Sequence, residues 1–268
     1  MRSAQPDMRT WERAEVTRSA AEASTTADAA LRMSALTRQR YRAPMAETTY
    51  PLEYAYHLLG DVRGRVVLDF GCGSGANSML LAGRGALVIG VDISDDLLQL
   101  ARRRLAINGA GEDCRFVVGS AHDLPLPDDS VDVVFGMAIL HHLDLDLVAR
   151  EVYRVLRPGG RAIFEEPVRN SRALRLMRRL VPLRSPDVSP FERPLTDAEL
   201  RRFTSRFDHV RVRAFGLPHV RLAKRLRLRG GLQSRAYASD GRLLRRWPAL
   251  ARYAAVRVLE VRRPMHAC

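Results

Sequence analysis

Two acidic residues bracket a run of glycines in the first third of the chain. Asp69 stands beside the turn Gly71-Cys72-Gly73-Ser74-Gly75, and Asp92 follows 23 positions after Asp69. Glycines permit positive φ and let the backbone approach a ligand closely. A dinucleotide site has the spacing G-x-G-x-x-G and holds a pyrophosphate at a helix N-terminus. Here the spacing is D-x-G-x-G-x-G, so Asp69 disfavours a phosphate at the turn and favours a cationic ligand.

The position of Asp92 narrows the choice of ligand. It ends an apolar run, and an acid at the end of the second strand of such a unit accepts hydrogen bonds from ribose hydroxyls. A ligand that carries an ammonium, a sulfonium, a ribose and a base is S-adenosylmethionine. The residues therefore predict S-adenosylmethionine as the cofactor, with S-adenosylhomocysteine as the product left after methyl transfer.

A strand, a turn, a helix and a second strand are needed to bring these residues together. An apolar run begins at Val66 and ends at Asp69, a helix-like segment follows the glycines, and a second apolar run ends at Asp92. The pattern predicts one βαβ unit over residues 66–93. The ligand is expected over the carboxyl end of its first strand.

Three segments resemble motifs of the class I S-adenosylmethionine-dependent methyltransferases, in the right order and spacing. Residues 66–93 are similar to motif I, residues 116–142 to the adenine loop and fourth strand, and residues 156–167 to the Pro-Gly-Gly turn and fifth strand. The resemblance, to the small-molecule "type 11"-like group, is firm over residues 60–168 and weaker over residues 195–263. It implies a Rossmann-like, doubly wound α/β fold with a seven-stranded sheet whose last strand is antiparallel beside the fifth.

The resemblance also assigns the residues that bind the cofactor. Where the family usually has an acid this chain has Ser120, which can still accept a hydrogen bond from the adenine amino group; His122 or Asp123 could share this role. The backbone amide of Ala121 could meet a ring nitrogen of the base, and Met137 would lie by the methionine portion. The residues expected to bind the cofactor are Asp69, Gly71, Cys72, Gly73, Gly75, Asn77, Asp92, Ile93, Ser120, Ala121, His122 and Met137.

Methyl transfer from a sulfonium is an in-line displacement, so the protein mainly aligns the reactants and excludes water. A base is needed only if the acceptor is protonated. His141 and His142 follow the fourth strand and are the first candidates for that base, with His141 favoured for substrate contact. Glu166 could orient a hydroxyl or an amine. The alternative is that the histidines are structural and that the glutamate pairs with a nearby arginine.

The charge of the chain is unevenly distributed. Of the 44 basic residues only Lys224 is a lysine, a bias towards arginine that is more typical of a GC-rich genome than of phosphate recognition. Residues 1–168 hold 19 basic and 23 acidic residues, a net charge of −4, whereas residues 169–268 hold 25 and 7, a net charge of +18. The positive field therefore belongs to the part after the fifth strand, where this fold holds its substrate.

Composition also bears on the class of protein and its location. A chain of 268 residues with 46% hydrophobic content can bury one substantial core. No apolar run approaches the roughly 20 residues that cross a bilayer, and the N-terminus lacks a secretory signal, so a soluble, cytoplasmic protein is expected. The three cysteines, Cys72, Cys114 and Cys268, imply neither a disulfide framework nor a metal site.

The expected elements divide the chain into an N-terminal extension and one methyltransferase domain. Residues 1–45 carry little apolar surface, so we expect disorder or a loosely docked helix, the alternative being a lid over the active site. Residues 46–268 form the domain, with 169–194 and 216–240 as cap or insertion segments. Helices are expected at 50–60, 94–108, 145–156, 169–183, 196–207 and 240–252, the last bent or split by Pro248; strands are expected at 66–69, 115–118, 131–135, 161–164, 209–215 and 254–262.

The leading hypothesis is transfer of a methyl group to a small-molecule or lipid-like acceptor that is anionic or hydroxylated, in specialised metabolism or in lipid or quinone biosynthesis. The basic amphipathic helix at 169–183 is an ordinary capping helix, a lid facing an anionic substrate, or a contact with an anionic membrane. A second hypothesis is methylation of RNA or protein. Residues 136–139 lack an Asn-Pro-Pro-Tyr-like motif, so base methylation of nucleic acid is disfavoured. A third is a relative that keeps the cofactor without methylating. The acceptor and the oligomeric state stay open.

Overall fold

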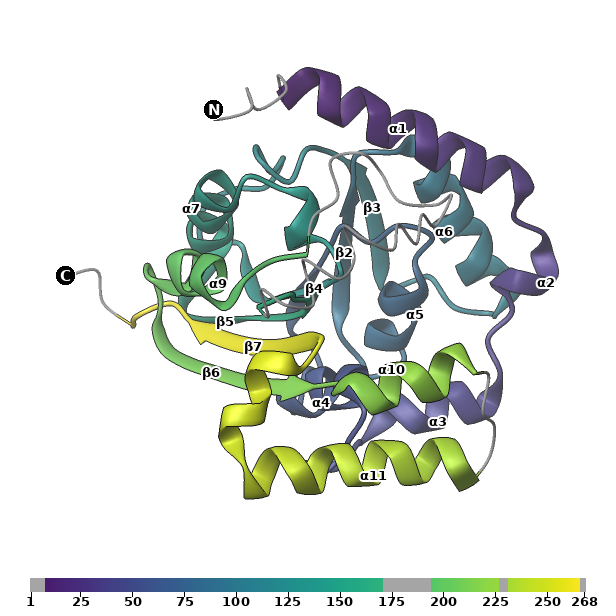
Figure 1. Ribbon diagram of the computed structural model, residues 1–268. Coiled ribbons are helices and arrows are strands. Elements are labelled where there is room, and N and C mark those ends of the chain that lie inside the picture. The colour runs from purple at the N-terminus through teal and green to yellow at the C-terminus, as the bar shows by residue number, and fades with distance from the viewer. Residues whose placement is uncertain (1–7, 171–193, 227–230, 266–268) are drawn as a thin grey trace.

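A single seven-stranded sheet forms the centre of the protein. The computed structural model describes residues 8–170, 194–226 and 231–265. The strand order is β3-β2-β1-β4-β5-β7-β6, with β7 antiparallel to both of its neighbours and the first five strands parallel (Figure 1). The predicted fold and the antiparallel strand beside the fifth are confirmed. The strands are β1 (Val66–Phe70), β2 (Leu87–Asp92), β3 (Cys114–Val118), β4 (Val131–Met137), β5 (Leu156–Pro167), β6 (Asp208–Phe215) and β7 (Val256–Arg262).

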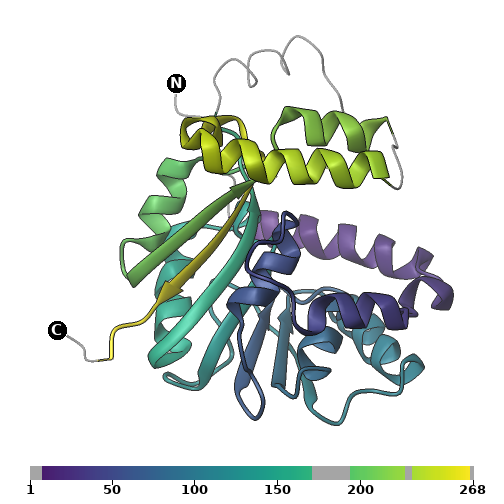
Figure 2. The same cartoon turned by 90° about the horizontal axis from the view of Figure 1, so that it is seen from below.

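Helices cover both faces of this sheet, which is why the central strands are mostly apolar. Successive side chains point to opposite faces: Val67 belongs to the core under α4 and α5, and Leu68 to the core under α7 and α9 (Figure 2). The helices of the domain are α4 (Pro51–Leu58), α5 (Ala76–Ala82), α6 (Asp95–Ile107), η1 (Leu140–His142), α7 (Leu145–Val155), α9 (Asp197–Thr204), α10 (Pro218–Arg225), α11 (Gly231–Arg246) and η2 (Pro248–Tyr253).

Local signals predicted several helix ends correctly. The Ser94 side chain accepts a hydrogen bond from the Leu97 amide and so begins α6, and Thr196 and Glu199 form a capping box at α9, where a helix is expected from residue 196. Pro248 separates α11 from η2, because proline has no amide hydrogen to continue a helix. The helix before it begins at Gly231, earlier than expected.

The expected turn at Pro158-Gly159-Gly160 is instead part of β5. Leu156 pairs with Val131 and Arg161 pairs with Val133. Between these two pairs β5 advances five residues while β4 advances two, so β5 contains a bulge. Gly159 has φ +76°, which lets the extra residues bulge out without ending the strand. The expectation that the strand begins at Arg161 is therefore wrong.

The N-terminal segment is helical and docked in the described part of the chain. It contains α1 (Met8–Thr25), α2 (Asp28–Leu31) and α3 (Ala35–Arg42), and α1 runs along the carboxyl edge of the sheet beside α6 (Figure 1). Leu31 is fully buried against Leu97 and Leu100 of α6, and its carbonyl accepts a hydrogen bond from Asn108 Nδ2 at 3.0 Å. The contact is thus both apolar and polar.

The two segments expected to form a cap are described only in part. The amphipathic helix at 169–183 lies outside the described residues from position 171 onward. The segment at 216–240 contains α10 and the first part of α11, which lie side by side at the edge of the molecule (Figure 2). None of the described helices combines the length and the apolar character needed to cross a membrane.

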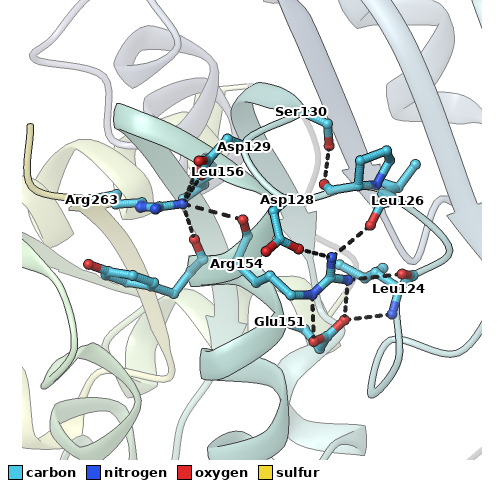
Figure 3. A network of polar contacts seen from close by, with 11 residues as sticks. Leu124, Leu126, Asp128, Asp129, Ser130, Glu151, Arg154, Leu156 and Arg263 are labelled. Atoms are coloured by element: carbon cyan, nitrogen blue, oxygen red, sulfur yellow. Dashed lines mark hydrogen bonds and ion pairs between the residues drawn. The ribbon is translucent and has the colours of Figure 1, made fainter. Parts of the chain in front are cut away.

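A polar network fixes the loop between β3 and β4 to α7 (Figure 3). The Arg154 guanidinium donates to the carbonyls of Leu124 at 3.0 Å and Leu126 at 2.7 Å, and it pairs with Glu151 at 2.7 Å. Glu151 in turn accepts a hydrogen bond from the Leu124 amide at 2.8 Å, and the hydrogen bond from Arg154 lowers the pKa of Glu151. The loop that begins at Gly119 is therefore held rigidly at its far end.

Candidate cofactor and active site

A cavity of about 430 Å³ opens at the carboxyl end of the parallel strands. Its walls come from the turn after β1, the end of β2, the loop after β3 and the segment after β4, and α1 closes it from above. The volume lies within the usual range for a small-molecule site. The expected residues that line it are Gly71, Gly73, Asp92, Ile93, Ser120, Ala121, His122, Met137 and His142.

Asp92 joins two walls of this cavity. Its Oδ2 accepts a hydrogen bond from the Gly73 amide at 2.8 Å, and its Oδ1 accepts one from the Ser94 amide at 3.0 Å. Burial raises the pKa of Asp92, and these amides oppose the rise. Each carboxylate oxygen can accept further hydrogen bonds, so the side chain can still receive ribose hydroxyls.

The three glycines of the turn are needed for different reasons. All have positive φ, between +51° and +73°. A methyl group on Gly75 would lie 2.7 Å from the Ala101 Cβ and 3.0 Å from its Cα, so Gly75 permits close packing of the turn on α6. A methyl group on Gly73 would meet nothing within 4 Å, in a position that lines the cavity. That open space lets a ligand approach the backbone.

Asp69 lies beneath the turn and does not line the cavity. Its side chain is 1% exposed and accepts a hydrogen bond from Ser78 Oγ at 2.5 Å. Burial raises the pKa of Asp69 to about 7, and repulsion by Asp92 adds to this effect. Asp69 can therefore act on a ligand through its charge and through the turn that it supports.

Cys72, Gly75 and Asn77 also lie outside the cavity lining. Cys72 is buried, and this burial raises the pKa of its thiol. Asn77 Oδ1 accepts a hydrogen bond from the Tyr56 hydroxyl at 3.1 Å, which ties α5 to α4. The structure thus gives these residues supporting positions around the turn.

The two histidines and Glu166 lie in different surroundings. His142 lines the cavity, whereas His141 is 6% exposed and turns towards the sheet, with its Nδ1 2.9 Å from Glu166 Oε2. Glu166 is fully buried, and its Oε1 accepts hydrogen bonds from the amides of Ile139 at 2.8 Å and Leu140 at 2.7 Å. The structure therefore brings His142 to the cavity and makes Glu166 a support for the segment after β4.

That segment is also strained. Ala138 has φ +53°, a conformation that an L-residue adopts at a cost of about 1–2 kcal/mol. Its amide donates to the Glu165 carbonyl at 2.8 Å, and its neighbours Met137 and Ile139 line the cavity with it. The hydrogen bonds of Glu165 and Glu166 hold this bend, which presents an apolar wall.

Sequence reasoning missed the residues that α1 contributes. The helix places one face over the cavity, and its lining residues recur at helical spacing. These residues are Trp11, Glu12, Glu15, Arg18, Ser19 and Glu22. The recurrence is visible in the sequence, but the face is polar, so it does not resemble a core-facing stripe.

The cavity carries a negative charge. Four carboxylates, Glu12, Glu15, Glu22 and Asp92, line it together with one guanidinium, Arg18, which pairs with Glu15 and Glu22. Such a lining fits a ligand with cationic groups and opposes a pyrophosphate. Among the described residues there is no cluster of three or more side chains that could hold a metal ion.

A larger cavity of about 530 Å³ lies between α9, β6 and α11, and its lining includes the arginines Arg201, Arg213, Arg245 and Arg257. Two of these arginines make polar contacts within the protein. Arg257 pairs with Asp197 at 2.9 Å, and Arg213 donates to the carbonyls of Ala46 at 2.6 Å and Thr48 at 2.8 Å. Arg257 thus joins β7 to α9, Arg213 joins β6 to the segment before α4, and neither lines the acid-lined cavity.

Comparisons with known proteins find methyltransferases among the proteins that this chain resembles. Residues 68–164 match a family model described as "Methyltransferase domain". A Streptomyces halstedii protein named methyltransferase GfsG is 39% identical over 128 residues, which are 47% of this chain and 46% of that protein. A Mycolicibacterium smegmatis fatty-acid O-methyltransferase is 34% identical over 149 residues, 54% of this chain and 47% of that protein.

A solved structure extends the likeness of the fold. The geranyl diphosphate C-methyltransferase from Streptomyces coelicolor, in complex with Mg²⁺, geranyl diphosphate and S-adenosyl-L-homocysteine, superposes with a TM-score of 0.56 at 20% identity. The alignment covers 78% of each chain. This chain spans about half the length of the curated relatives it matches.

Two glycine substitutions distinguish the glycine needed for a ligand to approach the backbone from the glycine needed for the turn to pack on α6. We expect Gly73→Ala to cost about 1 kcal/mol of folding stability, from its positive φ alone, yet to weaken S-adenosylhomocysteine binding at least about tenfold. Gly75→Ala should cost about 3 kcal/mol, because the methyl group also overlaps the α6 backbone. Urea unfolding and calorimetric titration measure the two effects. Unchanged affinity in Gly73→Ala would show that no ligand approaches this backbone.

The raised pKa of Asp69 predicts a pH-dependent stability. In the unfolded chain Asp69 loses its proton near its ordinary pKa of 3.8, whereas in the folded protein the pKa is about 7. The folded state therefore binds more protons between pH 4 and 7, and it loses stability as pH rises, by at most about 1.4 kcal/mol per pH unit. Asp69→Asn keeps a hydrogen-bond acceptor for Ser78 but does not titrate, so this loss of stability with rising pH is absent in the variant. The difference in unfolding free energy between variant and wild type should grow from pH 4 to 7; a constant difference would contradict the assignment.

Proposed function

We propose that this chain is a class I S-adenosylmethionine-dependent methyltransferase. It transfers a methyl group from S-adenosylmethionine to a small-molecule or lipid-like acceptor. The observation that carries the proposal is the acid-lined cavity at the carboxyl ends of β1 and β2, where Asp92 is bonded to the Gly73 amide. A cofactor with a ribose and two cationic groups matches this lining in charge and in size.

The chain's own residues fall into binding and positioning roles. Asp92 would receive the ribose hydroxyls, Gly73 would let the cofactor lie on the backbone, and the surrounding carboxylates would favour its positive charges. When bound, S-adenosylmethionine supplies an electrophilic methyl group on a positively charged sulfur. Met137, Ala138 and Ile139 would exclude water from the reacting end of the cavity.

His142 is the described residue best placed to take a proton from an acceptor. It lines the cavity beside Leu143, and its ring lies 4.1 Å from that of His141 and 6.5 Å from that of Trp11. Glu166 holds the segment that carries it through two backbone amides and His141. An acceptor hydroxyl or amine would lose its proton to His142, whereas a carboxylate acceptor would need no base.

Relatives support a lipid-like acceptor with an anionic end. One is named for fatty acids, and the structurally similar enzyme was solved with geranyl diphosphate. Both ligands join an apolar chain to an anionic group. The proposal therefore extends to a carboxylate or phosphate ester of apolar character, in specialised metabolism or in lipid or quinone biosynthesis.

Transfer of labelled methyl groups tests the proposed function. The protein is incubated with tritiated S-adenosylmethionine and a host lysate, and the label is partitioned among organic extract, protein and nucleic acid. We expect counts in the organic extract. Asp92→Asn should reduce them about tenfold or more, since it removes a charged acceptor of hydrogen bonds.

The distribution of label decides between acceptor classes. Counts in RNA or protein would contradict a small-molecule acceptor and favour a macromolecule. Equal transfer by wild type and Asp92→Asn would contradict the assigned cofactor site. Wild-type protein that neither transfers the label nor binds S-adenosylhomocysteine would overturn the methyltransferase proposal itself.

A further inference from the structure

The N-terminal helix α1 meets the loop after β3 through a specific polar contact. Ser120 Oγ donates a hydrogen bond to Glu12 Oε1 at 2.6 Å across 108 positions of sequence. His122 joins the same group, with its amide donating to Ser120 Oγ at 3.1 Å and its Nδ1 3.4 Å from Glu12 Oε1. Trp11 packs beside them, its ring 5.8 Å from that of His122.

The orientation of His122 is fixed by its other nitrogen. The Asp144 amide donates to His122 Nε2 at 3.0 Å, so Nε2 is an acceptor and the neutral ring carries its proton on Nδ1. Glu12 Oε1 therefore receives hydrogen from Ser120 and faces the Nδ1 hydrogen of His122. No described residue donates a hydrogen bond to Glu12 Oε2, although Glu12 lines the cavity.

The position of this group along the cavity identifies what it would contact. The site of the proposed function, on which this inference rests, runs from the turn after β1 to Asp92 at the end of β2. The next strand of the sheet is β3, so a base attached to a ribose held by Asp92 extends towards the loop after β3. There the lining offers the apolar side chains of Ile93, Leu97 and Leu124 for its faces.

The polar groups at this end match the edge of adenine. A carboxylate only accepts hydrogen bonds, so Glu12 selects a base that donates one, as the exocyclic amino group of adenine does. The amide of Ala121, which makes no hydrogen bond within the described part of the chain, can donate to a ring nitrogen. A base with a carbonyl in place of the amino group would put its carbonyl oxygen against the Glu12 carboxylate, and both groups only accept hydrogen bonds.

We infer that Glu12 on α1 recognises the adenine amino group and thereby supplies, from the N-terminal helix, the carboxylate that the loop lacks at Ser120. Ser120 and His122 then orient Glu12 and do not by themselves recognise the base. The helix is consequently part of the cofactor site, and S-adenosylhomocysteine should bind more weakly whenever α1 is displaced.

Discrimination between two ligands tests this role. Calorimetric titration compares S-adenosylhomocysteine with S-inosylhomocysteine, in which a carbonyl replaces the amino group, for wild type, Glu12→Gln and Glu15→Gln. Wild type should prefer the adenine ligand by about a hundredfold, because a mispaired polar group is strongly rejected. Glu12→Gln should reduce this preference about tenfold, since the amide can turn its nitrogen towards the carbonyl.

Glu15→Gln is the matched control. Glu15 lies on the same face of α1 and lines the same cavity, but its charge acts on Asp92 at the ribose end. This variant should change both affinities alike and keep their ratio. Circular dichroism of each variant checks that α1 and the domain stay folded.

The outcomes separate this inference from the proposed function. The role of Glu12 would be overturned if Glu12→Gln kept the wild-type ratio of the two affinities. It would also be overturned if this variant lost affinity for both ligands equally, as expected of Glu15→Gln. Either result would leave the cofactor site intact. Wild-type protein that binds neither ligand would overturn the proposed function and the inference with it. A preference that falls only in Glu12→Gln supports the assignment.

Discussion

The hydrogen bonds of one carboxylate, Asp92, hold together the parts from which the site is built. They tie the glycine turn after β1 to the end of β2 and, through the Ser94 amide, to the start of α6. The turn donates the Gly73 amide to Asp92, and Gly73 has a positive φ with open space in front of it. The walls of the cavity are thus joined by the residue that is also best placed to hold a ribose.

Charge then decides which ligand such a site can take. Asp92 lines the cavity and Asp69 lies beneath it, with the pKa of Asp69 raised to about 7 by burial and by Asp92. This concentration of acids costs stability unless a cation compensates it. The closing helix α1 adds three more carboxylates and one arginine, so closure increases the selection for a positively charged ligand and against a pyrophosphate.

Local pattern was enough to predict the scaffold. Alternation and apolar runs placed the strands, and Ser94, Thr196 and Pro248 marked helix ends, because such signals act over a few residues.

Contacts between residues that are distant in sequence could not be predicted from local pattern. The Glu12–Ser120 bond spans 108 positions, and the polar inner face of α1 gave no apolar stripe to reveal it. The choice between His141 and His142 depends on the buried carboxylate of Glu166, and the bulge at Gly159 depends on pairing with β4. In the same way, the net charge of +18 suggested a basic substrate site, whereas Arg213 and Arg257 of the larger cavity bind other parts of the protein.

The central claim is that this cavity binds an adenosine ligand with cationic groups and rejects a dinucleotide. The direct measurement is calorimetric titration of the wild-type protein at neutral pH with S-adenosylmethionine and, separately, with nicotinamide adenine dinucleotide. The account predicts one site for S-adenosylmethionine per chain and no measurable binding of the dinucleotide. Binding of the dinucleotide with equal or higher affinity would contradict it.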